Sequence, residues 1–336
     1  MRILLCEKYL VGLLILKFFV VGRLPPMFVQ RIRDAFSSTI ASRIISGLKV
    51  QRRTTFRVNL LKASPEEVER ALRMENIKFA RVKFPPNAYY LTGSSLKELQ
   101  STRVYRDGLI YVQSFSSMLP PLVLSPLPGE TVLDLGAAPG SKTTQMCAMM
   151  RNEGKIVAVE KNKIRYYKLK ANISRQGCSI VKPVLRDGSY LPASYRDCFD
   201  KVLLDAPCSG EGTFQESDPS SYAYWSVGKV HHWSWVQKKL FKSAYLALKK
   251  GGILVYSTCT ISPEENELVV AWALSQFRKL ELVPVDLSIF KGARVRLLRG
   301  LKTVYGEPLP EEIAGTLRIL PDEFWEGFFI AKFRKA

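Results

Sequence analysis

Two cysteines stand at the ends of apolar segments, where a thiol could act as a nucleophile. Cys208 lies in the segment Asp205–Gly212, which reads DAPCSGEG and begins at the last residue of the strand-like run 202–205. Cys259 ends the segment Tyr256-Ser257-Thr258-Cys259, after the run 253–257. Each cysteine alone could be a buried core residue, which is the commoner role of a free cysteine. Two such thiols at neighbouring strand ends, one with Asp205 nearby, favour catalysis.

The residues after Cys259 bear on its ionisation. Ser262-Pro263-Glu264-Glu265 matches a capping box with proline at the first helical position, so we expect a helix to begin there. The free N–H groups of a helix start favour a thiolate. The acidic residues Glu264, Glu265 and Glu267 partly oppose this effect.

A small-residue turn precedes the cysteines in the chain. The segment 134–144 reads DLGAAPGSKTT, which is an apolar strand, a turn rich in Gly and Ala, and a helix start. Such a turn lets the backbone approach a ligand and presents free N–H donors to it. One interpretation is a phosphate-binding P-loop, but Ser141 stands where GxxxxGK[ST] requires Gly.

The other interpretation of this turn is a nucleoside site. It requires an acid at the end of the next strand to accept from ribose hydroxyls, and Glu160 stands there, 18 residues after Lys142. Asp187, after the following strand, can accept from an adenine amino group. We favour the nucleoside interpretation, and a P-loop NTPase remains the alternative.

The elements that must position these residues follow from the pattern after Pro120-Pro121. Helical segments separate the earlier of the apolar runs, and the clearest is expected over 234–250, with a Ser234/Gln237 capping box. This alternation predicts a doubly wound, mostly parallel sheet over 116–336, whose ligands bind at the carboxyl ends of the strands. The predicted strands are 132–135, 156–160, 180–185, 202–205 and 253–257.

The residues before this domain form two predicted parts. Residues 27–115 begin with a basic amphipathic helix pair over 27–48 and continue as a small α/β domain of the type that presents a sheet to RNA. Residues 1–26 are expected to be an apolar tail and linker outside the folded domains. Their apolar run, Leu10 to Gly22, is broken by Lys17 and is too short to cross a bilayer.

Composition indicates a polyanionic partner. The 336 residues carry 50 Lys and Arg against 30 Asp and Glu, a net charge of +20, so we expect a nucleic acid as the partner and no membrane. The alternative is a charge that serves solubility or reflects a generally basic proteome. The six cysteines form no CxxC pair and only two histidines accompany them, so we expect no metal site. Reduced thiols fit a cytoplasmic protein, and we expect a monomer.

Taken together, these segments resemble the Sun-type RNA (cytosine-5) methyltransferases. The resemblance covers the chain from about Arg57 to the C-terminus, and the pair of cysteines is its most specific part. Ser141, Glu160 and Asp322 depart from the residues most common in that family. The resemblance rests on the blocks 134–143, 205–212 and 257–260 and on the flanking motifs Arg57-Val58-Asn59, Asp107-Gly108, Gln113-Ser114 and Gly327–Ala331.

The resemblance implies a fold and a reaction. The fold is the class I, Rossmann-like S-adenosylmethionine methyltransferase fold with a small α/β RNA-binding N-terminal domain. The reaction methylates carbon 5 of a cytidine in tRNA or rRNA. Cys259 is then the nucleophile at carbon 6, Cys208 assists release, Asp205 contacts the pyrimidine, and Lys142 lies near the base. In DNA cytosine methyltransferases the Pro-Cys motif carries the nucleophile, so Cys208 is the alternative for that role. The implied contacts to S-adenosylmethionine are Gly136, Ala137, Ala138, Pro139, Gly140, Ser141, Lys142, Glu160, Arg165, Asp187 and Asp205.

Two further groups of residues are candidates for RNA contact. An aromatic stretch can stack unpaired bases or simply anchor a loop, and it comprises Tyr222, Tyr224, Trp225, His231, His232, Trp233 and Trp235. A basic cluster can contact phosphates or form a basic loop, and it comprises Arg294, Arg296, Arg299 and Lys302. A non-catalytic RNA-binding protein is therefore a second alternative.

Overall fold

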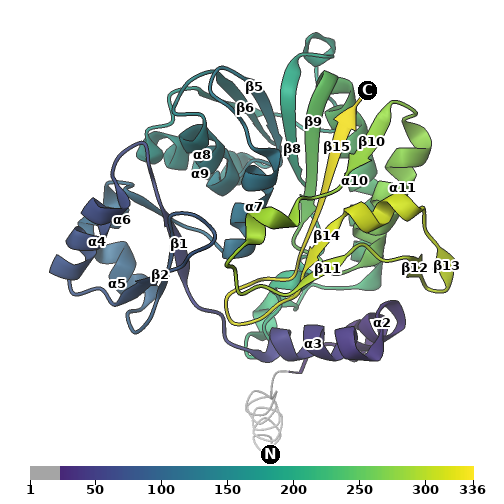
Figure 1. Ribbon diagram of the computed structural model, residues 1–336, viewed down its shortest axis with the longest axis horizontal. Coiled ribbons are helices and arrows are strands. Elements are labelled where there is room, and N and C mark those ends of the chain that lie inside the picture. The colour runs from purple at the N-terminus through teal and green to yellow at the C-terminus, as the bar shows by residue number, and fades with distance from the viewer. Residues whose placement is uncertain (1–22) are drawn as a thin grey trace, which may run out of the picture.

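The computed structural model describes residues 23–336, so the tail expected over residues 1–22 lies outside the described residues. Within them, a nine-stranded sheet forms the larger domain and a four-stranded sheet the smaller one (Figure 1). The strand order of the larger sheet is β11-β14-β15-β9-β8-β5-β6-β7, and β10 pairs with β15.

The five predicted strands of the larger domain are present and parallel to one another. They are β5 (Thr131–Leu135), β6 (Lys155–Glu160), β7 (Val181–Leu185), β8 (Phe199–Asp205) and β9 (Leu248–Thr258). The antiparallel strands are β10 (Leu280–Val283), β11 (Leu297–Arg299), β14 (Leu317–Ile319) and β15 (Phe328–Lys335). β5 lies between β6 and β8, so the order reverses there and opens the crevice where ligands of such sheets bind.

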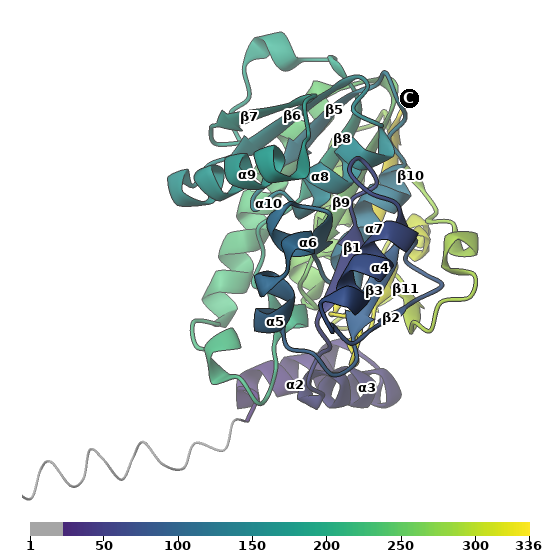
Figure 2. The same cartoon turned by 90° about the vertical axis from the view of Figure 1, so that its left-hand side faces the viewer.

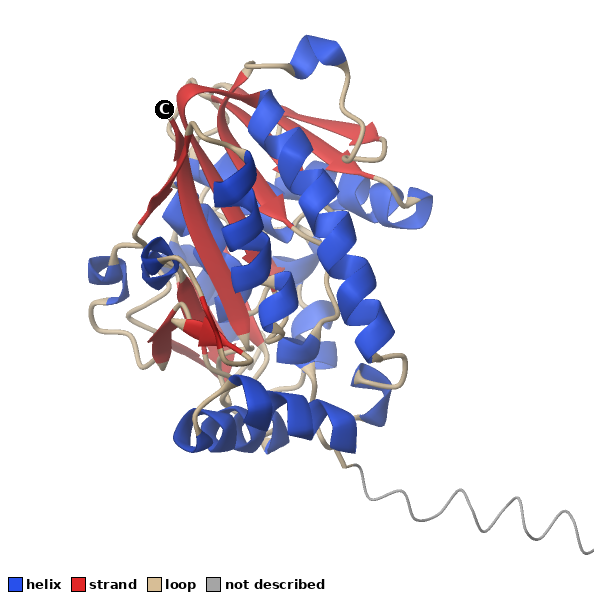
Figure 3. Ribbon diagram, turned by 90° about the vertical axis from the view of Figure 1, so that its right-hand side faces the viewer, coloured by secondary structure: helices blue, strands red, loops and turns tan. Residues whose placement is uncertain are grey.

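Helices cover both faces of this sheet because its strands are apolar on both faces. Leu203 of β8 packs into the core on one face, whereas Val202 and Leu204 pack into the core on the other. The first face carries α7 (Phe115–Leu124), α8 (Ser141–Met149) and α9 (Lys163–Gln176). The second carries α10 (Val227–Ala247) and α11 (Glu267–Gln276), both visible in Figure 3.

The smaller domain is an antiparallel sheet of order β2-β3-β1-β4, and helices pack against it. Its strands are β1 (Thr55–Val58), β2 (Phe79–Arg81), β3 (Ala88–Leu91) and β4 (Ile110–Val112). Its helices are α4 (Pro65–Met74), α5 (Leu96–Ser101) and α6 (Arg103–Arg106). The Ser64 hydroxyl accepts from the Glu67 N–H and the Glu67 side chain accepts in return, which confirms the predicted capping box.

The N-terminal helix pair is present as α2 (Pro26–Ala35) and α3 (Ser38–Lys49). It packs on the larger domain: Phe28 contacts Phe214, and the cluster includes Leu320. Figures 1 and 2 show the pair below both sheets. Leu24 is buried in the same cluster, so the expectation that all of residues 1–26 lie outside the fold is wrong at this residue.

Two expected helix starts are wrong. α10 begins at Val227 with Ser226 as its cap, and Ser234 is an interior residue whose hydroxyl donates to the Glu264 carbonyl. Lys249–Gly252, expected to end this helix, lies within β9. At Ser262 no capping hydrogen bond forms, and a 3-10 turn, η4 (Pro263–Glu265), precedes α11.

The remaining elements are short and lie at the edges. They are the hairpin β12 (Thr303–Val304) and β13 (Glu307–Pro308), and the 3-10 turns η1 (Ala193–Tyr195), η2 (Glu211–Thr213), η3 (Pro219–Ser221), η5 (Leu287–Phe290) and η6 (Glu311–Gly315). Over residues 23–336, no helix combines the length and apolarity that a membrane crossing requires.

Candidate active site

The two candidate thiols lie side by side at the carboxyl ends of β8 and β9. These strands are parallel neighbours, with Asp205 opposite Ser257, so the loops that follow them meet. The Sγ atoms of Cys208 and Cys259 are 3.3 Å apart, and both side chains are half-buried. The hydrogen bond to the Cys259 sulfur, together with burial, raises the pKa of Cys208 well above its ordinary value. The two thiols are therefore in direct contact, and Cys208 keeps its proton.

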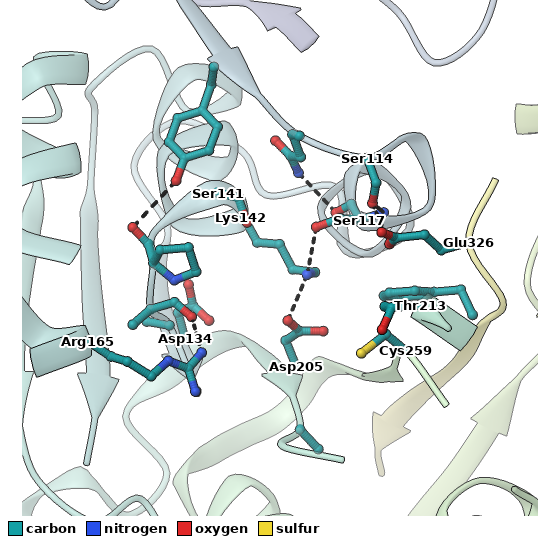
Figure 4. A pocket seen from close by; sticks show the side chains of 18 of the residues that line it. Ser114, Ser117, Asp134, Ser141, Lys142, Arg165, Asp205, Thr213, Cys259 and Glu326 are labelled. Atoms are coloured by element: carbon teal, nitrogen blue, oxygen red, sulfur yellow. Dashed lines mark hydrogen bonds and ion pairs between the residues drawn. The ribbon is translucent and has the colours of Figure 1, made fainter. Parts of the chain in front are cut away.

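A lysine–aspartate pair lies beside the thiols. Lys142 Nζ donates to Asp205 Oδ2 at 2.7 Å and to Ser117 Oγ at 2.9 Å, as Figure 4 shows. The other carboxylate oxygen, Asp205 Oδ1, accepts from Ser257 Oγ at 2.8 Å. Because both oxygens have partners, the carboxylate is fixed in orientation. The Lys142 ammonium is paired with a carboxylate, whereas the lysine of a P-loop contacts phosphate oxygens, which argues against the P-loop interpretation.

These side chains line a pocket of about 350 Å³ between the two domains. Tyr111, Gln113 and Ser114 line it from the smaller domain and the connection to α7, while Asp205 and Cys259 line it from the larger sheet. Polar side chains such as Gln113 and Asp205 share its lining with apolar ones such as Phe328, a combination that suits a flat, hydrogen-bonding ring.

Several lining residues were missed by the sequence reasoning. Gln113 is held by buried Arg57, whose Nε donates to Gln113 Oε1 at 2.8 Å. Glu326 accepts from Ser114 Oγ at 2.6 Å, and Ser117 contacts Lys142. Gln113 and Ser114 belong to a flanking motif in the sequence, but Ser117 and Glu326 gave no signal because only tertiary packing brings them to the pocket.

A second, larger cavity of about 1030 Å³ adjoins the first. Both cavities are lined by Gly136, Asp205 and Cys259, so they meet at the thiol and the fixed carboxylate. The larger cavity extends along the strand ends to Glu160 and Asp187. A ligand in it therefore reaches the same atoms as a ligand in the pocket between the domains.

Glu160 lies in this cavity as the sequence predicts. Its Oε1 accepts from the Asn162 N–H at 2.7 Å, whereas its Oε2 is buried without a hydrogen-bond partner. A buried acceptor without a partner is costly, so its position suits a ligand hydroxyl. Arg165 lies alongside, with Nη2 donating to the Ala138 carbonyl at 2.5 Å and Nε 3.9 Å from Glu160 Oε2.

Asp187 is less available to a ligand than expected. Its Oδ2 accepts from Lys161 Nζ at 2.5 Å and its Oδ1 from the Ser189 N–H at 2.9 Å. Burial acts to raise the pKa of Asp187, but the hydrogen bonds from Lys161 and Ser189 outweigh it and hold the pKa below its ordinary value. Asp187 is therefore ionised and lines the cavity.

Asp134 is a second buried carboxyl at these strand ends. Its Oδ2 accepts from Thr143 Oγ1 at 2.6 Å, and its Oδ1 is buried without a partner. Burial raises its pKa to about 7. The sequence reasoning used Asp134 only as the end of a strand, since its burial depends on the helices packed around it.

The small-residue turn has the backbone shape that its composition indicates. Gly136 has φ of 79° and Gly140 has φ of 104°, values that favour glycine. A Cβ at Gly136 would lie 2.5 Å from the Asp205 carbonyl oxygen, so the turn passes directly over the end of β8. The turn residues Gly136, Ala137, Ala138, Pro139 and Ser141 line the pocket, while Gly140 supplies the left-handed residue before α8.

The aromatic stretch divides into two sets. Trp225 packs on Phe28 and donates from Nε1 to Glu211, and Tyr222 packs on Phe214, so these two anchor a loop. The other set comprises His232, Trp233 and Trp235, which line the larger cavity, and the exposed Tyr224 and His231. Trp235 is 55% exposed, and Lys239 Nζ lies 3.4 Å from its ring centroid.

The basic cluster is smaller than the sequence indicates. Arg294, Arg296 and Lys302 are exposed. Arg299 is half-buried and donates from Nη1 to the Val285 carbonyl at 3.0 Å, so it supports the backbone. Over residues 23–336, no group of three or more His, Cys, Asp or Glu is arranged to hold a metal ion.

Comparison with known proteins agrees with this geometry. Residues 121–334 match the family model of the 16S rRNA methyltransferase RsmB/F, and residues 24–114 match that of the N-terminal domain of 16S rRNA methyltransferase RsmF. A tRNA (cytosine(49)-C(5))-methyltransferase of Pyrococcus abyssi is 41% identical over 84% of this chain and 88% of its own length. A ribosomal RNA small subunit methyltransferase F of Pectobacterium carotovorum is 36% identical over 94% of this chain, which spans 64% of that relative.

Solved structures support the same relationship. A methyltransferase homolog protein from Pyrococcus horikoshii aligns with a TM-score of 0.79 and 35% identity over 99% of this chain and all of its own. NSun6 from Pyrococcus horikoshii aligns with a TM-score of 0.78 over 94% of this chain and 99% of its own, and at 24% identity this match shows the fold alone. The chain belongs to the 16S rRNA methyltransferase RsmB/F family.

Proposed function

We propose that this protein transfers a methyl group from S-adenosylmethionine to carbon 5 of a cytidine in RNA. The observation that carries the proposal is the contact between the Cys208 and Cys259 thiols beside Asp205, where the two cavities meet. The names of the relatives support the RNA substrate and the position on the base, since one is a tRNA (cytosine(49)-C(5))-methyltransferase and another acts on ribosomal RNA.

The larger cavity fits the cofactor. The partnerless oxygen of Glu160 suits a ribose hydroxyl, and the partnerless oxygen of Asp134 suits an ammonium group. Asp134 and the turn Gly136–Ser141 line the smaller pocket, so the methionine part would cross the junction of the two cavities to reach them, and Arg165 and Asp187 would flank the nucleoside. S-adenosylmethionine would supply the methyl group at the junction of the two cavities, next to Asp205.

Cys259 would make the target base reactive. Carbon 5 of cytosine is a weak nucleophile, so a thiolate first adds to carbon 6 and forms a covalent bond that raises the electron density at carbon 5. After methylation, a base removes the carbon 5 proton and the bond between sulfur and carbon 6 breaks, which restores the ring and frees Cys259. The raised pKa of Cys208 keeps that thiol protonated while Cys259 attacks.

The neighbouring charged groups would orient the base. Asp205, held by Lys142 and Ser257, can accept from the pyrimidine edge and stabilise its protonated form. Lys142 Nζ lies between Asp205 and Ser117 and balances the carboxylate charge. Cys208 would assist removal of the carbon 5 proton and release, because it lies against the attacking sulfur. It would do so as a thiolate, after its own proton has passed to solvent.

RNA contact would use the basic surface and the exposed aromatic side chains. The net charge of +20 supports a polyanionic partner. Trp235 stacked on Lys239, with exposed Tyr190 nearby on the same cavity, offers a platform for an unpaired base. Thiol catalysis requires reduced cysteines, which supports a cytoplasmic protein. The mechanism needs one chain only, which is consistent with a monomer.

The test is direct. Purified protein is incubated with S-adenosylmethionine and, separately, with tRNA and ribosomal RNA lacking modifications, and 5-methylcytidine is located by bisulfite sequencing. We expect methylation at defined cytidines in one of the two RNA classes, and none with Cys259→Ala. RNA binding without any methylation would favour the non-catalytic alternative.

A further inference from the structure

The residues that follow the two cysteines in the chain are hydrogen-bonded to each other. Ser209 comes directly after Cys208 and Thr260 directly after Cys259, and their hydroxyl oxygens are 2.7 Å apart. Both hydroxyls also contact one carboxyl oxygen, Glu265 Oε1, through a short hydrogen bond from Ser209 and a longer one of 3.4 Å from Thr260. The loops after β8 and β9 are thus tied together at one side chain.

The same carboxyl holds the Cys208 loop from both sides. Glu265 Oε2 accepts from the Ser209 N–H at 3.0 Å and from Gln237 Nε2 at 2.8 Å. Gln237 Nε2 also donates to the Pro207 carbonyl at 2.9 Å. Ser209, after Cys208, is therefore bound to Glu265 directly, and Pro207, before it, is bound through Gln237. Glu265 itself is fully buried.

The protonation of Glu265 follows from its surroundings. Burial, and the negative charge of Glu211, raise its pKa to about 8, so it is mostly a neutral acid at pH 7. Its Oε2 receives two N–H donors, so the proton of the neutral acid lies on Oε1, the oxygen that contacts the two hydroxyls. A glutamine satisfies the same pattern, because its oxygen accepts and its NH₂ group donates.

We propose that Glu265 is a positioning residue that holds the Cys208 sulfur against the Cys259 sulfur. The proposal concerns geometry, but its catalytic consequence rests on the proposed function. Removal of the Glu265 side chain frees the Cys208 loop to move away from Cys259, whereas the amide of Gln preserves the tie. Release of the methylated RNA then slows in the first variant and not in the second.

The first measurement needs no RNA. Each protein is treated with diamide, and formation of the Cys208–Cys259 disulfide is followed by peptide mass spectrometry, which separates it from other thiol pairs. Because effective concentration depends steeply on separation, we expect Glu265→Ala to slow the reaction by about tenfold or more and Glu265→Gln by less than about twofold. Equal rates in Glu265→Ala and the unmodified protein would overturn the proposal, as would Glu265→Gln behaving like Glu265→Ala.

A matched control is available on the same 3-10 turn. Glu264 is also buried, but it pairs with Arg31 at 2.6 Å and does not contact either loop hydroxyl. Glu264→Ala is therefore expected to lower the melting temperature without slowing disulfide formation. If Glu265→Ala does not fold, Ser209→Ala removes the hydroxyl tie alone and is expected to slow the disulfide reaction in the same direction.

The second measurement links the geometry to release. With substrate RNA and S-adenosylmethionine, Glu265→Ala is expected to accumulate a protein–RNA adduct on a denaturing gel, and Glu265→Gln is not. If no protein methylates any RNA, the proposed function fails while the disulfide result still tests Glu265; if the RNA is methylated but Glu265→Ala accumulates no adduct, Glu265 has no role in release. If the adduct forms in all variants but disappears equally fast, Glu265 has no role in release.

Discussion

The Sγ atoms of Cys208 and Cys259 are 3.3 Å apart although 50 residues separate them in the chain. Both follow strands that are parallel neighbours, and Asp205 and Ser257, which stand opposite each other in these strands, are hydrogen-bonded at 2.8 Å. One thiol therefore changes the chemistry of the other, and the raised pKa of Cys208 is the first sign of this coupling.

The roles of the two thiols can be distinguished by trapping the covalent protein–RNA intermediate. We expect Cys259→Ala to abolish methylation and any covalent link to RNA, because no sulfur then attacks carbon 6. Cys208→Ala is expected to attack and methylate but to eliminate slowly, so a protein–RNA adduct accumulates that survives a denaturing gel. An adduct with Cys259→Ala and none with Cys208→Ala would give the attack to Cys208.

Glu160→Ala is expected to weaken S-adenosylmethionine binding. The substitution removes the partnerless Oε2 and with it one charged hydrogen bond, which corresponds to about 1.5–3 kcal/mol, or roughly a tenfold to 150-fold higher Kd. Calorimetry with the cofactor measures this directly. Glu153→Ala, at an exposed acid before β6, is the control and should leave the Kd unchanged; the same Kd in both variants would remove Glu160 from the cofactor site.

Asp134 makes stability depend on pH. Its folded-state pKa of about 7 lies above its ordinary value of 3.8, so the folded state binds the extra proton and stability falls as pH rises from about 4 to about 7. The slope from this group is at most about 1.4 kcal/mol per pH unit. Its charged neighbours are Asp205, Lys142 and Glu160. Thermal melts of the cofactor-free protein should decline less steeply over this range with Asp134→Asn, and an identical slope would show that Asp134 is ionised throughout.

The basic cluster is expected to set part of the salt dependence of RNA binding. Each phosphate contact on a single strand contributes roughly 0.7 to the slope of log affinity against log salt concentration, so Arg294→Ala with Arg296→Ala should flatten it by about 1.4. Arg299 is excluded because it supports the Val285 carbonyl. The charge-matched control is Lys155→Ala with Lys250→Ala, two exposed lysines near the amino ends of β6 and β9. Equal slopes in the two double variants would mean that the cluster does not contact phosphate.

Local patterns in the sequence predict the helices and strands and identify the residues that carry the chemistry. The capping box at Ser64, the turn at Gly136–Gly140 and the five parallel strands depend on residues a few positions apart, so their patterns are readable in one dimension. The same holds for Glu160, which the strand–turn–helix pattern places at the end of β6. Family resemblance then supplied the expected roles of the thiols.

Which of these residues contact one another depends on how distant segments pack. In the sequence, Glu265 matches the acidic residue of a capping box. In the structure no capping hydrogen bond forms at Ser262, and the Glu265 carboxyl instead accepts from the Ser209 N–H and from Gln237. Ser234 lies inside α10 because that helix begins about two turns earlier, at Val227, where Ser226 caps it and the preceding Trp225 packs on Phe28 of α2. Ser117 joins Lys142 only because α7 packs across the sheet. Such contacts form because whole helices and strands bury their apolar side chains against one another. This packing involves residues far apart in the chain, so no short sequence pattern predicts it.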